Sequence, residues 1–351
     1  MKKVFIILGV LIALIVVVKA CNKSNPYKHK IWTQADYDKA ASGVVLIDGA
    51  YALEVEMKDG RKYYVSPSVI SKDKVSEQDI SSELTEDKLA GYMGTGFFIS
   101  KDGKIATNQH VVDPFYSVPK SNIESQIEKV FKNYEKQLDA VATAYTMEGD
   151  AKQAEYYRAL ALAYGVGVKE GSLKAKVVLA ANFNETYGQT EKCAILYDSD
   201  DENADVAIIQ LESKKTPADR YVFTLADKHT QKRDYKKGTQ VTLIGFNEGH
   251  NLDVNTFSKT GVEKLVKSQQ MSGRITQLTN KYEIMYDATT LSGASGSPVL
   301  NKYGDVIAVH HAGKINTNMA MFGIKEKEQG FNYGIKIPWL QKLLNQQDDD
   351  K

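Results

Sequence analysis

The segment 293–298, which reads Gly-Ala-Ser-Gly-Ser-Pro, constrains this 351-residue chain more than any other. Glycine takes backbone angles that other residues avoid, so the two glycines that flank Ala294-Ser295 favour a tight turn. In such a turn the amides of Gly293 and Ser295 can face one small concavity and stabilise a negatively charged oxygen. The turn predicts a serine nucleophile, Ser295, with its oxyanion hole. A plain loop of small residues remains the alternative.

A serine hydroxyl is a poor nucleophile at neutral pH, so it needs a base and a group that orients the base. Residues 94–100 and 105–108 read as two strands joined by the turn 101–104, and His110 follows the second strand. Asp205 precedes the apolar run 206–209, which is typical of a buried strand. The candidate base, orienting carboxylate and nucleophile therefore follow one another as His110, Asp205 and Ser295.

These residues and their flanks resemble the chymotrypsin-like superfamily of serine proteases. The resemblance is carried by Gly-Thr-Gly-Phe-Phe at 94–98, Thr-Asn-Gln-His-Val-Val at 107–112, Asp-Val-Ala-Ile-Ile at 205–209 and the stretches 286–300 and 306–310. Within the superfamily the sequence is most similar to the glutamyl endopeptidases and more distantly to the HtrA-like proteases. By motif the likeness covers roughly residues 90–113 and 190–340.

The resemblance implies a mainly β fold with two six-stranded barrels, and an endopeptidase that works through an acyl-enzyme. His110 takes the proton of Ser295, Asp205 holds the imidazole, and the amides of Gly293 and Ser295 receive the oxyanion. The expected partner is a protein or peptide substrate. The alternative is a catalytically silent protease fold that serves as a membrane-anchored binding module.

Asp205 competes with nearby acidic residues for the orienting role. Asp198, Asp200, Asp201 and Glu202 form an acidic loop, which is interpreted as a solvated face or, alternatively, a weak cation site. Only Asp205 directly precedes the apolar strand, so it is the preferred candidate.

Ala294 departs from the digestive proteases, which carry an aspartate just before the nucleophile and use it to capture a new amino terminus. The resemblance therefore predicts that this activation switch is lacking, and it leaves open what makes the oxyanion turn rigid.

The resemblance also suggests a substrate preference. In glutamyl endopeptidases a threonine five residues before the nucleophile and a histidine on the following strand contact the acidic side chain of the substrate. Thr290 and His310 occupy the matching positions. A partly charged imidazole beside a hydroxyl would favour a carboxylate, so cleavage after acidic residues is expected. The alternative is that His310 and His311 are simply polar residues near a strand end.

The amino terminus predicts export and anchoring. Two lysines precede the apolar run 4–18, which is shorter than the roughly 20 residues of a membrane-spanning helix and matches a signal peptide. Ala20-Cys21 resembles a bacterial lipoprotein cleavage site, so Cys21 is the candidate lipidation site and the protein is expected to be exported and membrane-anchored. Lys19 is unusual there and keeps an uncleaved anchor as the alternative.

Composition limits the other possibilities. If Cys21 carries lipid, Cys193 has no partner for a disulfide and is expected to be an ordinary strand residue. No cluster of histidine and cysteine at metal-binding spacing occurs, so neither a metal nor a cofactor is expected. A net charge of +1 argues against a nucleic-acid partner.

A helical insertion is predicted between His110 and Asp205. Apolar residues recur every three or four positions from Ile123 to Tyr145, and Ser121 with Glu124 matches a capping box. Asp150 with Gln153 is expected to cap a second helix that reaches about Tyr164. Tyrosines at helical spacing along both helices indicate packing between the hairpin and the barrel or, alternatively, a partner-binding face.

The domain boundaries follow from these elements. We predict a signal peptide at 1–20, a polar tether at 21–41, and a first barrel at 42–215 that contains the hairpin at 121–165. Residues 66–90 are expected to be loop-like. The second barrel, with a closing helix that starts at Pro338, spans 216–345, and an acidic tail occupies 346–351.

Overall fold

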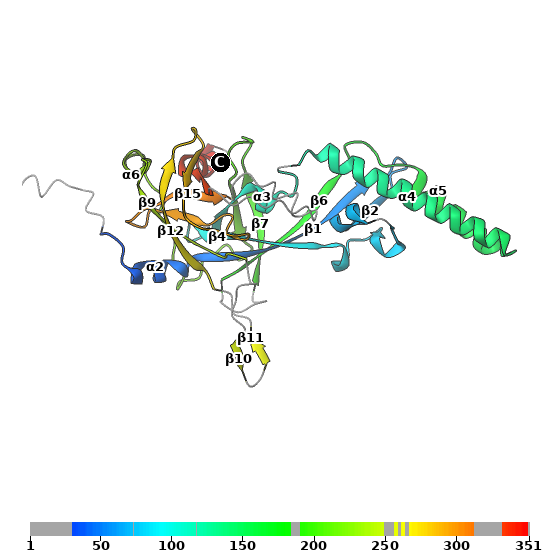
Figure 1. The fold of residues 1–351 in the computed structure, drawn as a ribbon, viewed down its shortest axis with the longest axis horizontal. Helices are drawn as coiled ribbons and strands as arrows, with labels where there is room; N and C mark the ends of the chain where they lie inside the picture. The colour runs from blue at the N-terminus through cyan, green and yellow to red at the C-terminus, as the bar shows by residue number, and fades with distance from the viewer. Residues whose placement is uncertain are drawn as a thin grey trace, which may run out of the picture.

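The computed structural model describes residues 30–72, 74–116, 118–183, 190–248, 256–258, 261–263, 267–311 and 332–349. It contains two closed antiparallel barrels of six strands each, with an added helical hairpin and a carboxyl-terminal helix (Figure 1). The predicted fold class is therefore confirmed. The predicted signal peptide and Cys21 lie outside the described residues.

The first barrel has the strand order β1-β4-β5-β8-β7-β6 and closes by pairing β6 with β1. The strands β2 and β3 continue the same sheet beyond β1. The bounds are β1 Val44–Glu56, β2 Lys62–Val65, β3 Ile80–Ser81, β4 Ala90–Phe98, β5 Lys104–Thr107, β6 Lys174–Asn182, β7 Thr190–Asp198 and β8 Ala207–Leu211.

The second barrel has the order β12-β13-β16-β15-β14-β9, and a two-stranded sheet of β10 and β11 stands apart from it. The bounds are β9 Gln240–Gly245, β10 Thr256–Ser258, β11 Gly261–Glu263, β12 Gln269–Gln277, β13 Glu283–Tyr286, β14 Pro298–Leu300, β15 Val306–His311 and β16 Asn332–Lys336. Between the barrels the chain forms the short helix α6, Lys228–Asp234.

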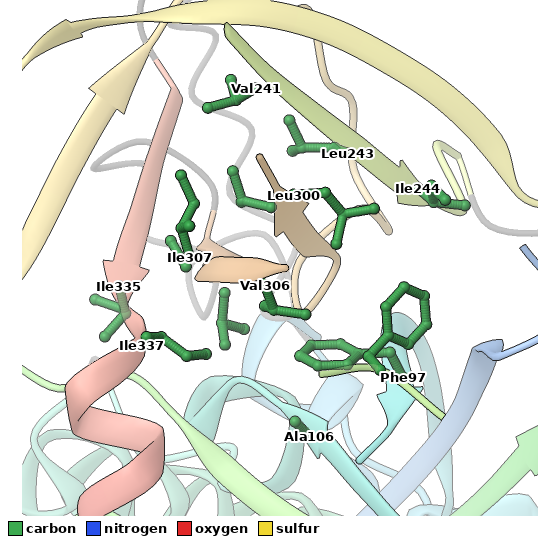
Figure 2. Packing of buried hydrophobic residues seen from close by; sticks show 14 of the residues in the cluster. Phe97, Ala106, Val241, Leu243, Ile244, Leu300, Val306, Ile307, Ile335 and Ile337 are labelled. Carbon is green, nitrogen blue, oxygen red and sulfur yellow. The ribbon is translucent and has the colours of Figure 1, made fainter. Parts of the chain in front are cut away.

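One hydrophobic core crosses the boundary between the barrels (Figure 2). Phe97 and Ala106 of the first barrel belong to the same buried cluster as Val241, Leu243 and Ile307 of the second. Burial of apolar surface is the main stabilising term in folding, so this shared cluster holds the two barrels against each other. The site described below lies where they meet.

The strand β1 is long and continuous. It pairs with β4 without a break from Val44 to Tyr51. Gly49 does not interrupt the strand. A side chain there would meet the ring of Tyr92 at 2.3 Å, so the glycine makes room for a packed tyrosine.

The predicted hairpin consists of α4, Lys120–Met147, and α5, Ala151–Gly165, and it projects away from the barrels (Figure 1). Asp150 accepts a hydrogen bond from Gln153 N and caps α5 as expected. Tyr134 and Tyr164 join an apolar cluster with β1 and β2. The rings of Tyr145 and Tyr157 stack on each other, and Tyr156 is exposed. The predicted packing against the strands is therefore found for Tyr134 and Tyr164, whereas Tyr145 and Tyr157 pack within the hairpin.

The capping box predicted at the start of α4 is wrong. The N-cap is Pro119, two residues before Ser121, and the helix begins at Lys120. Both carboxylate oxygens of Glu124 instead accept hydrogen bonds from the amides of Gly171 and Leu173, at 3.0 and 3.1 Å. Glu124 therefore anchors the hairpin to the chain that leads into β6.

Residues 66–90, expected to be loop-like, contain three short 3₁₀ helices, which are η1 Pro67–Ser71, η2 Glu77–Asp79 and η3 Glu86–Lys88, together with β3. Val69, Val75 and Ile80 from this segment are buried in the cluster that packs against α4. Two insertions, one between β1 and β4 and one between α3 (Gln109–Val112) and β6, thus fold together as one lobe.

Both ends of the described chain pack on the second barrel. The predicted tether is folded in its described part: Trp32 packs against Gly304, and Gln34–Ala41 forms α2. The closing helix α8 spans Ile337–Asp349 and so includes most of the predicted acidic tail. Within the described part of the chain, no helix is long and apolar enough to span a membrane.

Candidate active site

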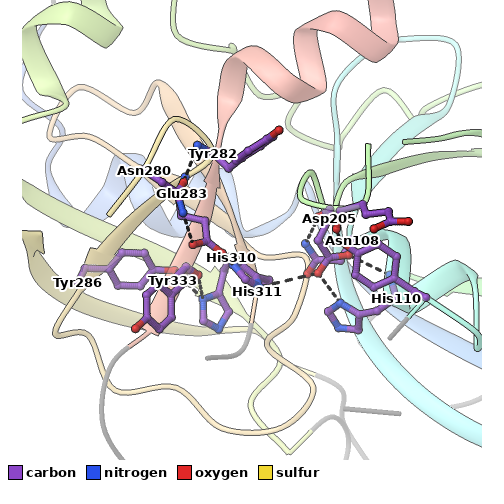
Figure 3. Close-up of polar contacts among 12 residues, drawn as sticks. Asn108, His110, Asp205, Asn280, Tyr282, Glu283, Tyr286, His310, His311 and Tyr333 are labelled. Atoms are coloured by element: carbon purple, nitrogen blue, oxygen red, sulfur yellow. Dashed lines mark hydrogen bonds and ion pairs between the residues drawn. The ribbon is translucent and has the colours of Figure 1, made fainter. Parts of the chain in front are cut away.

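His110 and Asp205, which are 95 residues apart in the chain, are in direct contact. His110 lies on α3 just after β5, and Asp205 precedes β8, which pairs with β5. His110 Nδ1 lies 2.6 Å from Asp205 Oδ2, and the backbone amide of His110 donates to Asp205 Oδ1 at 3.0 Å (Figure 3). The carboxylate therefore holds Nδ1 in its protonated form and leaves Nε2 free to accept a proton.

Asp205 is suited to remain a carboxylate. Burial acts to raise its pKa, but the charge and hydrogen bonds of His110, with a further contribution from His311, lower the pKa below its usual value. Asn108 Nδ2 donates to the backbone carbonyl of Asp205 at 2.7 Å and fixes the segment that carries it. Ionised and held at two points, Asp205 can orient the imidazole.

The predicted nucleophile turn is present at 293–296. Gly293 and Gly296 have φ angles of +90° and +92°, in the region that favours glycine. Any side chain on Gly296 would come within 1.9 Å of the carbonyl oxygen of Thr95. Both glycines therefore give the turn its conformation, and Gly296 also leaves space for the carbonyl of Thr95.

The amides of the turn divide into bonded and free ones. Those of Ala294, Gly296 and Ser297 donate to Leu291 O, His310 O and Ala294 O, respectively. Within the residues that the structure describes, the amides of Gly293 and Ser295 donate to nothing. These are the two donors that the sequence assigned to the oxyanion hole, and their lack of internal partners leaves them available to a ligand oxygen.

Thr95, in the middle of β4, holds the turn in place. Its amide donates to Ser295 O and its hydroxyl to Gly293 O, both at 2.7 Å. The same hydroxyl accepts from Phe246 N at 3.1 Å. Ser297 Oγ also donates to Ala294 O, at 2.6 Å. These bonds hold the turn rigid. They answer the question raised by Ala294, which stands where the digestive proteases carry an aspartate.

The nucleophile turn and the His110–Asp205 pair adjoin each other. Thr107 Oγ1, three residues before His110, donates to Thr95 O at 2.8 Å, and Thr95 in turn binds Ser295 O. Among the described residues no hydrogen bond joins Ser295 Oγ to His110. Catalytic hydrogen bonds are often long without substrate and tighten in the complex.

Thr290 and His310, the candidate substrate contacts, are both engaged. Thr290 Oγ1 donates to Asn332 Oδ1 at 2.7 Å. His310 is fully buried, and its Nδ1 faces Tyr286 Oη at 2.5 Å and Tyr333 O at 3.2 Å (Figure 3). Burial and the neighbouring His311 lower the pKa of His310 to about 3. The expectation of a partly charged imidazole is therefore wrong for the free protein, because the ring is neutral at ordinary pH.

The remaining candidates have structural surroundings. Asp201 Oδ2 accepts from Tyr282 Oη at 3.0 Å, so the acidic loop touches the second barrel. No group of three or more potential metal ligands occurs within the described ranges. Burial, with a smaller effect of Glu191, raises the pKa of the Cys193 thiol to about 12, which leaves it unreactive at neutral pH.

A protein-family model described as a trypsin-like peptidase domain matches residues 94–309, more than half of the chain. The protein belongs to this family of serine peptidases. Among solved structures, the chain is similar to a serine endoprotease from Yersinia pestis, with 12% identity and a TM-score of 0.43 over 90% of this chain and 67% of that one. No curated protein sequence matches it.

Sequence reasoning missed the supporting residues Thr95, Asn108 and His311. Thr95 and Asn108 lie inside the motifs that carried the resemblance, and their proximity to the motif residues was the only available signal. Their roles depend on contacts between segments 97 to 198 residues apart, which a single sequence does not reveal.

Proposed function

We propose that the protein is a serine endopeptidase in which Ser295 is the nucleophile, His110 the general base and Asp205 the orienting carboxylate. The observation that carries this proposal is that the amides of Gly293 and Ser295 have no partner among the described residues, on a turn linked through Thr95 to the strand end before His110. A plain structural loop has no need to leave two such donors unsatisfied.

The chemistry follows from these positions. His110 Nε2 takes the hydroxyl proton as Ser295 Oγ attacks the peptide carbonyl, and the free amides bind the resulting oxyanion. His110 then protonates the leaving amine, and water hydrolyses the acyl-enzyme by the same route. Asp205 stabilises the imidazolium that forms in each half-reaction.

A fluorophosphonate probe tests the proposal, because it reacts only with an activated serine. Labelling is expected for the native chain and for Ser292→Ala, which removes an exposed hydroxyl three residues away. It is expected to vanish in Ser295→Ala and to fall by several orders of magnitude in His110→Ala. Mass spectrometry locates the adduct. A native chain that never labels supports the alternative, a catalytically silent protease fold that binds a partner.

For the substrate we propose an acidic residue before the cleaved bond, in line with the resemblance to glutamyl endopeptidases. The supporting observation is His310 Nε2, which is buried and has no hydrogen-bond partner among the described residues. Because Nδ1 faces the carbonyl of Tyr333, Nε2 of the neutral ring carries a lone pair. A carboxylate that reached this nitrogen would bind together with a proton.

This coupling makes the preference testable. Peptides that differ only by Glu or Gln before the cleaved bond are compared as the pH is lowered from 8 to 6. The KM for the Glu peptide should fall relative to that for the Gln peptide, because binding takes up a proton. Equal cleavage of both peptides at every pH would remove the proposed contacts of Thr290 and His310.

We further propose that the protein is exported and held at a membrane by its amino terminus, through lipid on Cys21 or an uncleaved leader. The basic residues and short apolar run of the leader support this. Mass spectrometry of the membrane-bound form distinguishes the two. Loss of residues 1–20 with a lipid mass on Cys21 supports cleavage, and an intact leader supports the anchor.

A further inference from the structure

His311 lies between carboxylates that come from the two barrels (Figure 3). Its Nδ1 is 3.9 Å from Asp205 Oδ2 of the first barrel, and its Nε2 is 3.0 Å from Glu283 Oε1 on β13 of the second. All three side chains are poorly exposed, at 16% for His311, 6% for Asp205 and 18% for Glu283. The row Glu283, His311, Asp205, His110 thus alternates acid and imidazole.

The two contacts of the His311 ring are electrostatic. Nε2 is close to Glu283 but does not make a well-directed hydrogen bond. The 3.9 Å separation from Asp205 is also beyond hydrogen-bonding distance. Only the doubly protonated ring presents an N–H to both acids. Such charges attract strongly where water is scarce.

The oxygen of Asp205 that faces His311 is also the one that binds His110. Asp205 Oδ2 lies 2.6 Å from His110 Nδ1, while Oδ1 accepts the His110 amide. A positive charge at His311 therefore stabilises the ionised carboxylate at the atom that orients the imidazole.

We propose that His311, anchored by Glu283, is a positioning residue for the triad: from the second barrel it keeps Asp205 ionised and directed at His110. This inference rests on the proposed function for its catalytic consequence. The geometry also explains why assembly of both barrels would be needed for a competent His110, since His311 and Glu283 come from one barrel and Asp205 from the other.

Other ionisable groups lie around this row among the described residues, and their side chains are the same in every variant. They are His310, the preceding residue on β15; Tyr333 on β16, whose ring centroid is 6.2 Å from that of His311; Tyr116, whose hydroxyl donates to Glu202 O; and Lys336, which acts electrostatically with Glu283. Because His311 also lowers the pKa of His310, the kinetic comparison uses a peptide with Gln before the cleaved bond.

The kinetic test compares His311→Gln, Glu283→Gln and the double variant in the full chain. On a peptide with Gln before the cleaved bond, which takes up no proton at His310, His311→Gln should lower kcat about tenfold with KM changed less than twofold. The deficit should widen as the pH falls, since loss of a positive neighbour makes His110 easier to protonate. Glu283→Gln should cost less, and the double variant should be no worse than His311→Gln alone. A deficit that is the same at every pH, or additive losses, would overturn the proposal.

A second readout does not require activity. In Ser295→Ala protein with ¹⁵N-labelled histidine, NMR follows protonation of the His110 ring with and without His311→Gln. The midpoint should rise by about one pH unit, a tenfold change in proton affinity. An unchanged titration overturns the role of His311. If the native chain fails to react with fluorophosphonate but His311→Gln still shifts the protonation of His110, only the proposed function is refuted.

Discussion

At the scale of single residues, Thr95 controls the nucleophile turn most directly. Thr95→Val keeps the shape but removes the hydroxyl that bonds Gly293 O and Phe246 N. Both partners are buried, so the loss should cost about 1–3 kcal/mol of stability and loosen the oxyanion donors. We expect kcat/KM to fall about 10- to 100-fold, whereas Thr95→Ser, which keeps the hydroxyl, stays near native. Equal activities of the two variants would contradict this role.

His310 should make stability depend on pH. Its pKa is about 3 in the folded chain, against about 6.5 when unfolded, so below pH 6.5 the unfolded state binds one more proton. The contribution of the neutral His310 ring to the free energy of unfolding is fully present above pH 6.5. It falls by about 1.4 kcal/mol per pH unit as the solution is acidified towards pH 3. Between pH 6.5 and 5, the free energy of unfolding measured with urea should fall by about 2 kcal/mol more in the inactive Ser295→Ala chain than in the same chain carrying His310→Gln.

The matched control for this measurement is His229→Gln, which alters an exposed histidine on α6. It should lose stability on acidification as the parent does. If His310→Gln also followed the parent curve, the buried neutral ring would not be the cause.

The individual site residues differ in how far the sequence could predict them. His110, Asp205 and Ser295 lie in motifs with distinctive neighbours, so the sequence indicated each one, and the structure brings the first two into contact. The charge state of His310 could not be predicted, because it depends on complete burial beside His311. Thr95 gained its role only when the fold placed it against Gly293.

At the scale of elements, the lobe formed by the two insertions depends on its own apolar cluster. Phe131 of α4 is 1% exposed and packs against the rings of Tyr63 and Tyr164. Phe131→Ala should lower the free energy of unfolding by about 3–5 kcal/mol, measured by urea denaturation of the inactive chain. Leu162→Ala, at a site 75% exposed on α5, should change it by less than about 0.5 kcal/mol. Similar losses for both would show that α4 is not packed as described.

Local patterns predicted most elements and failed where a distant contact decided the outcome. The hairpin followed from its apolar spacing, and the cap of α5 at Asp150 followed from local chemistry. Glu124 matched a capping box, yet its carboxylate bonds amides near residue 171 instead.

At the scale of the whole molecule, the core shared by the barrels should make them unfold together. Phe97 is fully buried in β4 and packs edge-on against Phe223, in the cluster that continues into the second barrel. The chain has two tryptophans, and both report on the second barrel, since Trp32 packs on Gly304 and Trp339 lies on α8.

Phe97→Ala alters the first barrel, and we expect it to destabilise the chain by about 3–5 kcal/mol. Because the cluster is continuous, tryptophan fluorescence from the second barrel should shift its urea midpoint by the same amount as far-UV circular dichroism. In the proposed mechanism fluorophosphonate labelling needs Ser295 from one barrel and His110 from the other, so it should disappear at that midpoint too. A tryptophan transition that stays at the native midpoint would instead mean that the barrels are separate folding units. The packing of Phe97 would then stabilise only the first barrel.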